Sequence, residues 1–312
     1  MVRDKFLITG CAGFIGGHTV DRLVDNGFDV TGLDDLSTGS PANMAASEGR
    51  FTFIEGSVCD RDAVRRALEG VTRVIHLASV PSVPRSVDAP LESAMASVVG
   101  TVTLLDEARK SGVKRVVQAA SSSAYGDNPL LPRRETQLPC PMSPYAVAKL
   151  TQEYYLSAFC KCYGLDGASL RYFNVFGPRQ SPYSKYAAVI PKFITMMMEG
   201  QPPVIYGDGE QTRDFTYIDN VVDANVGAAL ASGSLGGETV NIGAGGGYSL
   251  NDLAARLNAI LRTSLEPVHE PVRAGDVRDS MADVSKANKL FGYVPAVDFA
   301  EGLRRTVKSF QA

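Results

Sequence analysis

The sequence predicts an α/β protein with a doubly wound parallel sheet and a smaller second region interleaved with it. Three observations favour this class. Short apolar runs alternate with helical stretches through the first 172 residues. A glycine-rich turn joins the first run to the first helix. After Asn174 the alternation gives way to an irregular pattern punctuated by glycine and proline.

The elements of the sheet can be followed in order. The run from Lys5 to Thr9 ends in glycines, and His18 to Asn26 follows with apolar residues at helical spacing. Runs that are apolar on both faces are typical of buried parallel strands. Further strands are expected at 28–33, 50–55, 74–78, 115–119 and 167–171, with helices at 62–69, 92–111 and 144–163.

The second region is expected to be interleaved with the sheet. Glycine and proline are frequent from Gly177 to Pro182 and again from Gly200 to Gly209. A strand at 238–242 would return to the sheet, and 250–261 and 299–310 have the spacing of amphipathic helices. The predicted domains are 1–172 plus about 214–243, and about 173–213 plus 244–312.

Composition excludes several classes of protein. The net charge of −3 is spread over interspersed signs, so no nucleic-acid-binding surface is indicated. Five cysteines without a CxxC pair favour neither a disulfide framework nor a zinc site, and no metal site is expected. No apolar run reaches the roughly 18 residues of a membrane span, and Met1 to Gly10 lacks a signal-peptide core. A cytoplasmic protein with a small ligand is expected.

The turn Gly10-Cys-Ala-Gly13-Phe-Ile-Gly16 indicates a dinucleotide site. Side chains at these positions would obstruct a pyrophosphate, and the following helix presents free N–H groups and a positive dipole end. Asp34 lies 18 residues beyond Gly16, at the end of the second strand. Its carboxylate would accept from a ribose 2′-hydroxyl and repel a 2′-phosphate, so NAD is preferred over NADP. Asp35 is either a solvated turn residue or an adenosine contact.

Tyr145 and Lys149 lie four residues apart and would face the same side of one helix. An ammonium group beside a phenol favours phenolate, which lowers the phenol pKa and lets it take a proton from an alcohol. Next to a nicotinamide ring, such a pair could interconvert an alcohol and a ketone.

Together with Ser121-Ser-Ser-Ala-Tyr-Gly126, these motifs resemble the extended short-chain dehydrogenase/reductase family, in particular its nucleotide-sugar 4-epimerases. The likeness covers essentially the whole chain. It implies a Rossmann-like NAD-binding first domain and a nucleotide-sugar-binding second domain. It also implies that Ser121 orients the sugar O4, that Tyr145 is the acid/base and that Lys149 holds the nicotinamide ribose.

The resemblance also implies the remaining contacts of the site. Expected cofactor contacts, besides Tyr145 and Lys149, are Gly10, Gly13, Phe14, Ile15, Gly16, Asp34, Asp35, Ser37, Gly39, Ser57, Val58, Leu77, Ala78 and Phe173. Expected substrate contacts are Ser82, Ser122, Ser123, Asn174, Gln180, Ala188, Val189, Tyr206, Arg213, Arg273, Asp276 and Ser280. Asn174 and Arg213 would contact the diphosphate.

The reaction implied is C4 epimerisation of a UDP-hexose. Tyr145 would take the O4 proton while the C4 hydride passes to NAD, leaving a 4-ketose. The ketose would turn over and receive the hydride on its other face. The likeness also implies a homodimer in which 92–111 and 144–163 form a four-helix bundle, although apolar helix faces could equally pack within one chain.

The sugar is argued from substitutions within the family pattern. Ser122 and Ser123 stand where 4,6-dehydratases carry an Asp-Glu pair, and decarboxylases also need an acidic residue that this segment lacks. Ser181 stands where uronate epimerases carry an arginine. Ser280 replaces the tyrosine of simple glucose/galactose epimerases and leaves room for an acetamide. UDP-N-acetylglucosamine and UDP-N-acetylgalactosamine are therefore preferred.

Several alternatives stay open at this point. UDP-glucose and UDP-galactose remain possible substrates, as does UDP-glucuronate or another nucleotide sugar of the family. A noncatalytic NAD-binding sensor or scaffold is the alternative to an enzyme, against which the intact Ser121, Tyr145 and Lys149 argue. Three departures from the family pattern, at Ser57, Pro81 and Ser97, could reshape the cofactor or sugar pocket. The three histidines receive no role.

Overall fold

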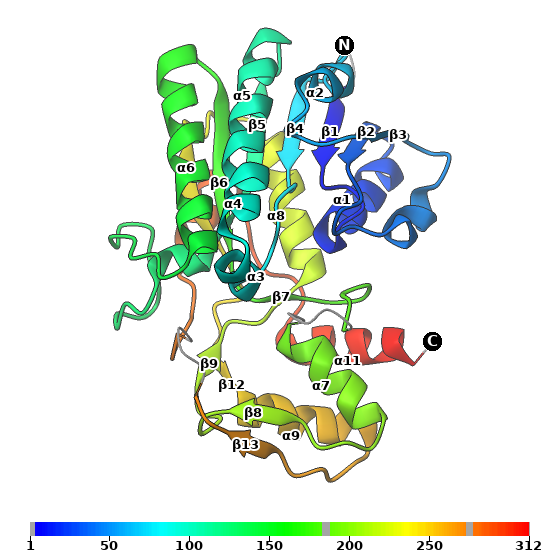
Figure 1. Ribbon diagram of the computed structural model, residues 1–312, viewed down its shortest axis with the longest axis vertical. Helices are drawn as coiled ribbons and strands as arrows, with labels where there is room; N and C mark the ends of the chain where they lie inside the picture. The colour runs from blue at the N-terminus through cyan, green and yellow to red at the C-terminus, as the bar shows by residue number, and fades with distance from the viewer. Residues whose placement is uncertain (1–3, 183–187, 273–276, 312) are drawn as a thin grey trace.

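The computed structural model describes residues 4–182, 188–272 and 277–311. Its central sheet has seven parallel strands in the order β11-β6-β5-β4-β1-β2-β3 (Figure 1). The predicted doubly wound, Rossmann-like α/β class is confirmed. The strands are β1 Lys5–Thr9, β2 Asp29–Asp34, β3 Thr52–Glu55, β4 Arg73–His76, β5 Arg115–Ser121, β6 Asp166–Tyr172 and β11 Glu238–Ile242.

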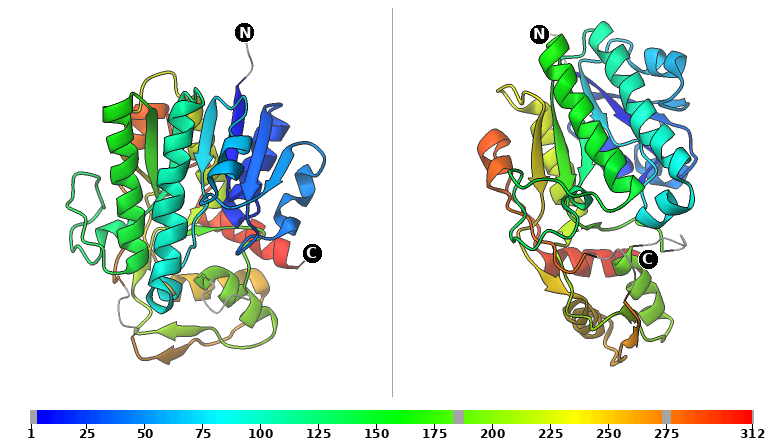
Figure 2. Two further views of the ribbon diagram at one scale, coloured as in Figure 1. Left: turned by 45° about the horizontal axis from the view of Figure 1, so that its top comes forward. Right: turned by 60° about the vertical axis from the view of Figure 1, so that its left-hand side comes forward.

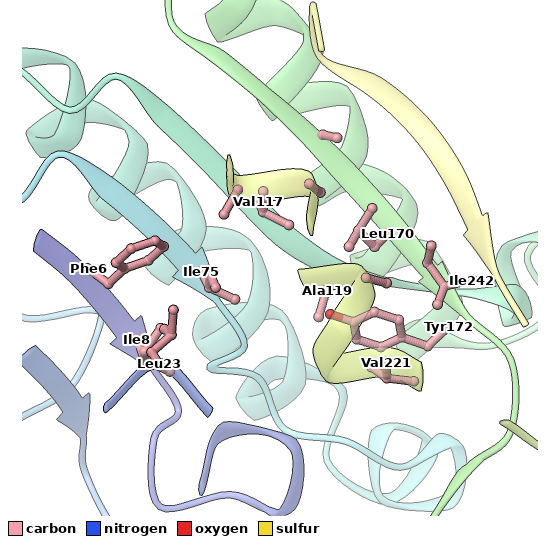
Figure 3. Packing of buried hydrophobic residues seen from close by; sticks show 14 of the residues in the cluster. Phe6, Ile8, Leu23, Ile75, Val117, Ala119, Leu170, Tyr172, Val221 and Ile242 are labelled. Carbon is pink, nitrogen blue, oxygen red and sulfur yellow. The ribbon is translucent and has the colours of Figure 1, made fainter. Parts of the chain in front are cut away.

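Helices cover both faces of the sheet. Successive residues of a strand point to opposite sides, so each strand contributes apolar side chains to both faces. Phe6 and Ile8 of β1 pack into one buried cluster, and Leu7 between them packs into the other. Figure 3 shows the first cluster, in which strand side chains meet Leu23 and Val221 from the covering helices. That face carries α1 Phe14–Asp25 and α8 Ile218–Leu230, and the opposite face carries α2 Arg61–Ala67, α5 Gly100–Lys110 and α6 Pro144–Tyr163.

The helix expected at 92–111 is interrupted. It begins as α4 Pro90–Ala94, continues as one π turn, η2 Met95–Val99, and then becomes α5. The carbonyl oxygen of Ser97 in this turn accepts hydrogen bonds from Gln152 Nε2 at 3.0 Å and Thr101 Oγ1 at 2.5 Å. Because the Ser97 carbonyl has these partners, the backbone hydrogen-bond pattern of the helix can change locally at this point. Such π turns are frequent at functional sites.

The second part of the molecule lies below the sheet in Figures 1 and 2 and has its own aromatic core. Phe176, Phe193, Phe215 and Phe299 are all buried in it. The chain enters this part after β6, and α8 and β11 then rejoin the sheet, which gives the predicted interleaving. Its elements are β7 Val175–Phe176, α7 Val189–Met198, β8 Val204–Tyr206, β9 Thr212–Arg213, β10 Thr216–Tyr217, β12 Tyr248–Ser249, α9 Leu250–Leu261, β13 Val268–Glu270 and α11 Phe299–Phe310.

Four short elements complete the described part of the chain: η1 Pro41–Ser47, α3 Val83–Asp88, η3 Ser122–Tyr125 and α10 Ser285–Phe291. Ala287 of α10 packs into the buried cluster on the sheet face that α1 and α8 cover. The domain bounds given above stay a prediction. Among the described residues, no helix combines the length and the apolar character that a membrane crossing requires.

Candidate active site

One large cleft, of about 1520 Å³, runs along the carboxyl ends of the strands and into the second part of the molecule. This edge of a doubly wound sheet is where such folds bind ligands. The predicted cofactor residues that line it are Gly10, Gly13, Phe14, Ile15, Gly16, Asp34, Asp35, Ser37, Ser57, Val58, Leu77, Ala78, Tyr145 and Lys149. The predicted substrate residues that line it are Ser82, Asn174, Gln180, Ala188, Val189, Tyr206 and Arg213.

The glycine turn leaves no space for side chains. A Cβ on Gly16 would lie 1.9 Å from the carbonyl oxygen of Gly10, and one on Gly10 would lie 2.8 Å from the amide nitrogen of Ala78. Gly10 also has a φ of +73°, which favours glycine. Gly13 precedes α1 and gives it no side-chain cap, so the first N–H groups of α1 are open to a ligand phosphate. This cradle fits the pyrophosphate of NAD.

Asp34 ends β2 with a buried carboxylate. Its Oδ2 accepts from the backbone N–H of Ala12 at 2.9 Å, and its Oδ1 accepts from that of Leu36 at 2.8 Å. These bonds fix the carboxylate at the edge of the glycine turn. Burial raises the pKa of Asp34, while the two N–H groups partly oppose the rise. The position fits recognition of a ribose hydroxyl, as the sequence predicts.

Tyr145, Lys149 and Ser121 come together where α6 meets the end of β5. The hydroxyl of Ser143 caps α6 by accepting from the N–H of Ala146 at 3.2 Å, and the N–H of Tyr145 donates to Ser86 Oγ at 3.0 Å. Lys149 Nζ donates to the carbonyl oxygen of Ala119 at 3.0 Å and lies 6.0 Å from the centre of the Tyr145 ring. The two side chains therefore face the same side of α6, as their spacing predicts.

The electrostatics of this group differ in part from the sequence expectation. Burial raises the pKa of the Tyr145 phenol, and the Ser121 hydroxyl, hydrogen-bonded to it, opposes the rise. The expectation that the Lys149 ammonium lowers this pKa is wrong for the protein without cofactor, because burial has the larger effect and the ammonium is directed at the carbonyl oxygen of Ala119. Burial lowers the pKa of Lys149 from 10.5 to about 8, with the Glu153 carboxylate opposing the change.

Several predicted residues lie beside the cleft. Ser123 Oγ donates to Ser121 Oγ at 2.8 Å, and Ser122 and Ser123 both belong to η3. Ser280 is almost fully buried, and its N–H donates to Thr212 O at 3.2 Å. Gly39 packs against Ala12. Arg273 and Asp276 lie outside the described residues.

The prediction for Phe173 needs correction. Its side chain is fully buried and packs with Tyr125 and Ala282 behind the end of β5. Because the ring has no accessible surface, it offers nothing for a nicotinamide to contact. The next residue in the chain, Asn174, lines the cleft instead.

His76, for which no role is predicted from the sequence, is a buried hydrogen-bonding group. Its Nδ1 lies 2.6 Å from Thr9 Oγ1, and its Nε2 lies 2.9 Å from Thr101 Oγ1. Thr9 Oγ1 in turn accepts from the N–H groups of Leu77 and Ala78, which line the cleft. Burial lowers the pKa of His76 to about 3, so the ring is neutral and structural.

Cleft residues from distant elements were also missed. Arg85 of α3, Lys192 of α7 and Arg179 of the loop after β7 all line the cleft. No local spacing connects them with the glycine turn or with Tyr145. In the described ranges, no cluster of three or more histidine, cysteine, aspartate or glutamate side chains is placed to hold a metal ion.

The doubly wound parallel sheet and the cleft lined by the glycine turn define a dinucleotide-binding protein. Comparison with known proteins supports this class. A sequence model of the NAD dependent epimerase/dehydratase family matches residues 6–243. A UDP-glucose 4-epimerase of Mycolicibacterium smegmatis is 40% identical over 311 residues, which cover 98% of each chain.

Two solved structures are also similar. A UDP-N-acetylglucosamine 4-epimerase from Methanobrevibacter ruminantium, in complex with UDP-N-acetylmuramic acid, is 38% identical with a TM-score of 0.94, over 100% of this chain and 99% of that one. A UDP-glucuronic acid 4-epimerase from Bacillus cereus, in complex with UDP-glucuronic acid and NAD, is 32% identical with a TM-score of 0.91, over 98% and 99% of the two chains. The chain belongs to the NAD-dependent epimerase/dehydratase family. It is an isomerase, and its cofactor is NAD.

Lys149→Met is expected to stabilise the protein at neutral pH. A lysine whose folded pKa lies below its unfolded value destabilises the fold while it is charged, and this penalty disappears as pH rises from about 8 to 10.5. Methionine keeps the alkyl stem, so the variant should gain roughly 1–3 kcal/mol at pH 7, and less near pH 9.5. Urea unfolding at both pH values measures the gain.

The matched control is Lys161→Met, an exposed lysine on the same helix, which should change stability by less than about 0.5 kcal/mol. If Lys149→Met is less stable than the parent at pH 7, the ammonium is a net stabilising group and this account of its burial is wrong.

Proposed function

We propose that this isomerase interconverts the C4 epimers of a UDP-hexose, with UDP-N-acetylglucosamine and UDP-N-acetylgalactosamine as the preferred pair. The observation that carries the proposal is that Tyr145 and Lys149 line the same cleft as the glycine turn, with the Ser121 hydroxyl hydrogen-bonded to Tyr145. The Mycolicibacterium smegmatis, Methanobrevibacter ruminantium and Bacillus cereus proteins described above, which this chain resembles over nearly its whole length, are 4-epimerases of UDP-sugars.

The proton is moved by Tyr145. Its phenol is hydrogen-bonded to Ser121, whose hydroxyl can also hold the sugar O4 beside the phenol oxygen. NAD, when bound, accepts and returns the hydride, and the positive charge of its oxidised ring favours the phenolate form of Tyr145. Lys149 adds a second positive charge about one helical turn away.

Elimination chemistry is disfavoured by the residues around Ser121. Ser122 and Ser123 have hydroxyls, which are poor proton donors near neutral pH. Ser123 is moreover engaged with Ser121. The ketose formed at C4 therefore has no acid placed in this segment to drive loss of water, and return of the hydride is the remaining outcome.

The second part of the cleft would hold the nucleotide diphosphate and the sugar. Arg213 lies in β9 and lines the cleft, where its guanidinium can face a diphosphate. Thr212, its neighbour, connects this strand to the segment with Ser280 through hydrogen bonds to Ser280 N and to Asp279. The small Ser280 side chain would thus lie close to the anchored end of the sugar and leave space for an acetamide.

A substrate panel with two variants tests this function. Wild-type protein should convert UDP-N-acetylglucosamine at least as well as UDP-glucose, and much better than UDP-glucuronate. Ser280→Tyr should lose roughly 10-fold or more with the N-acetylated sugar and little with UDP-glucose, because only the acetamide needs the space. Tyr145→Phe should lose about 100-fold or more with every sugar, since it lacks the proton donor.

Each outcome separates a different part of the proposal. A strong preference of the wild type for UDP-glucose, or equal losses of both sugars in Ser280→Tyr, contradicts the acetamide pocket. Conversion of UDP-glucuronate above the others selects the uronate alternative. Near-normal turnover of Tyr145→Phe would show that Tyr145 does not transfer the proton. If the wild type converts none of the sugars, the epimerase proposal is wrong and a noncatalytic NAD-binding scaffold is the remaining alternative.

We also propose that the protein is a homodimer. Val87, Leu91, Met95 and Val99 are exposed and recur every four residues along α3, α4 and the π turn. Exposed apolar residues of the neighbouring α6, including Tyr154, extend this surface. Sedimentation should give twice the 33.3 kDa chain mass, and Leu91→Glu should give the single-chain mass. A monomeric wild type contradicts the proposal.

A further inference from the structure

Arg179 is held in an unusual backbone conformation beside the cleft. It follows β7 in the loop that also carries Gln180, and both residues line the cleft. Its φ of +67° lies in the left-handed region, which is unfavourable for a residue with a side chain. Such a conformation persists only where surrounding contacts hold it.

The guanidinium of Arg179 reaches two elements of the cofactor-binding part. Nη1 donates to the carbonyl oxygen of Asn43 at 2.8 Å and lies 2.9 Å from Asp21 Oδ2. Asn43 belongs to η1 and Asp21 to α1. The Arg179 side chain, from the loop after β7, therefore joins α1, which follows the glycine turn, to η1, which follows β2.

His18 strengthens the same junction. Its Nε2 lies 3.2 Å from Arg179 Nε and 3.0 Å from the carbonyl oxygen of Pro178, and depending on the tautomer it accepts from the arginine or donates to the carbonyl. Burial lowers the pKa of His18, which favours the neutral ring. A neutral His18 ring does not repel the positively charged Arg179 guanidinium.

The segment η1 is itself placed against the glycine turn. The N–H of Ser40 and Nδ2 of Asn43 both donate to the carbonyl oxygen of Ala12, each at 2.9 Å. Ser47 Oγ donates to Asp21 Oδ1 at 2.5 Å, so Asp21 joins η1 and Arg179 through its two oxygens. Because Asn43 lines the cleft, a displacement of η1 would open the cofactor end.

We infer that Arg179 is a positioning residue that holds η1 against α1 and thereby retains NAD in the cleft. The inference rests on the proposed function for its purpose, since an epimerase that returns its own hydride must keep the reduced cofactor until the ketose has turned over. Its geometric basis does not depend on the sugar. Because Arg179 lies in the same loop as Gln180, a predicted substrate contact, a movement of this loop would also affect how the cofactor is retained.

The test measures release of NADH without any sugar present. Protein loaded with NADH is mixed with excess NAD, and the decay of bound-NADH fluorescence gives the release rate. Arg179→Gln should release NADH at least about tenfold faster than the parent, because it loses the charge-assisted contacts, and Arg179→Lys should be intermediate. Arg50→Gln, which breaks an exposed ion pair with Asp25 away from the cleft, should match the parent.

Two further measurements exclude a purely structural effect. Circular dichroism and thermal unfolding check that the Arg179 variants fold. Asp21→Asn keeps the arginine and removes its ionic partner, so it should accelerate release by a smaller factor and show a non-additive effect in combination with Arg179→Gln. Release within twofold of the parent in Arg179→Gln, or additive effects of the two changes, would overturn the inference, whether or not the protein epimerises UDP-sugars.

Discussion

The ammonium group of Lys149 lies 3.0 Å from the carbonyl oxygen of Ala119 and is almost fully buried between α6 and the sheet. Helices that cover a parallel sheet normally present apolar residues to it. Here the inward face of α6 also carries Gln152 and Glu153, both buried. The contact between α6 and β5 is therefore partly polar, and each buried group needs a partner.

The partners of these groups extend through the sheet. Glu153 receives two hydrogen bonds from Arg171 of β6, at 2.9 and 2.7 Å. Gln152 donates to the carbonyl oxygen of Ser97, which connects α6 to the π turn. A charge that is unfavourable for stability is thus held beside Tyr145, the residue proposed to transfer the proton, and the surrounding hydrogen bonds fix its position.

Local patterns predicted most of the fold. The helices at 144–163, 250–261 and 299–310 have the predicted bounds, because their apolar spacing and terminal residues are local signals. The π turn could not be predicted in this way, since Gln152, which binds the Ser97 carbonyl, is 55 residues away in the sequence. Asp34 and the glycine turn could be predicted because strand, turn and helix are adjacent.

The parts of the site that escaped prediction depend on burial and on distant contacts. The pKa of Tyr145 is raised by its surroundings, which no spacing of Tyr and Lys reveals. Phe173 precedes Asn174, which lines the cleft, yet its own side chain lies in a buried cluster. Arg179 meets Asn43, 136 residues earlier in the chain, only because the fold brings η1 and the loop after β7 together.

The most direct test of the account follows the hydrogen at C4. UDP-N-acetylglucosamine carrying deuterium at C4 is incubated with the protein and NAD, and the epimer is examined by NMR and mass spectrometry. Because the chain is proposed to return the same hydride to the same carbon, the product should keep its deuterium at C4, and product made from unlabelled substrate in D₂O should gain none. Loss of the label to solvent, or accumulation of a ketone with NADH, would contradict the account.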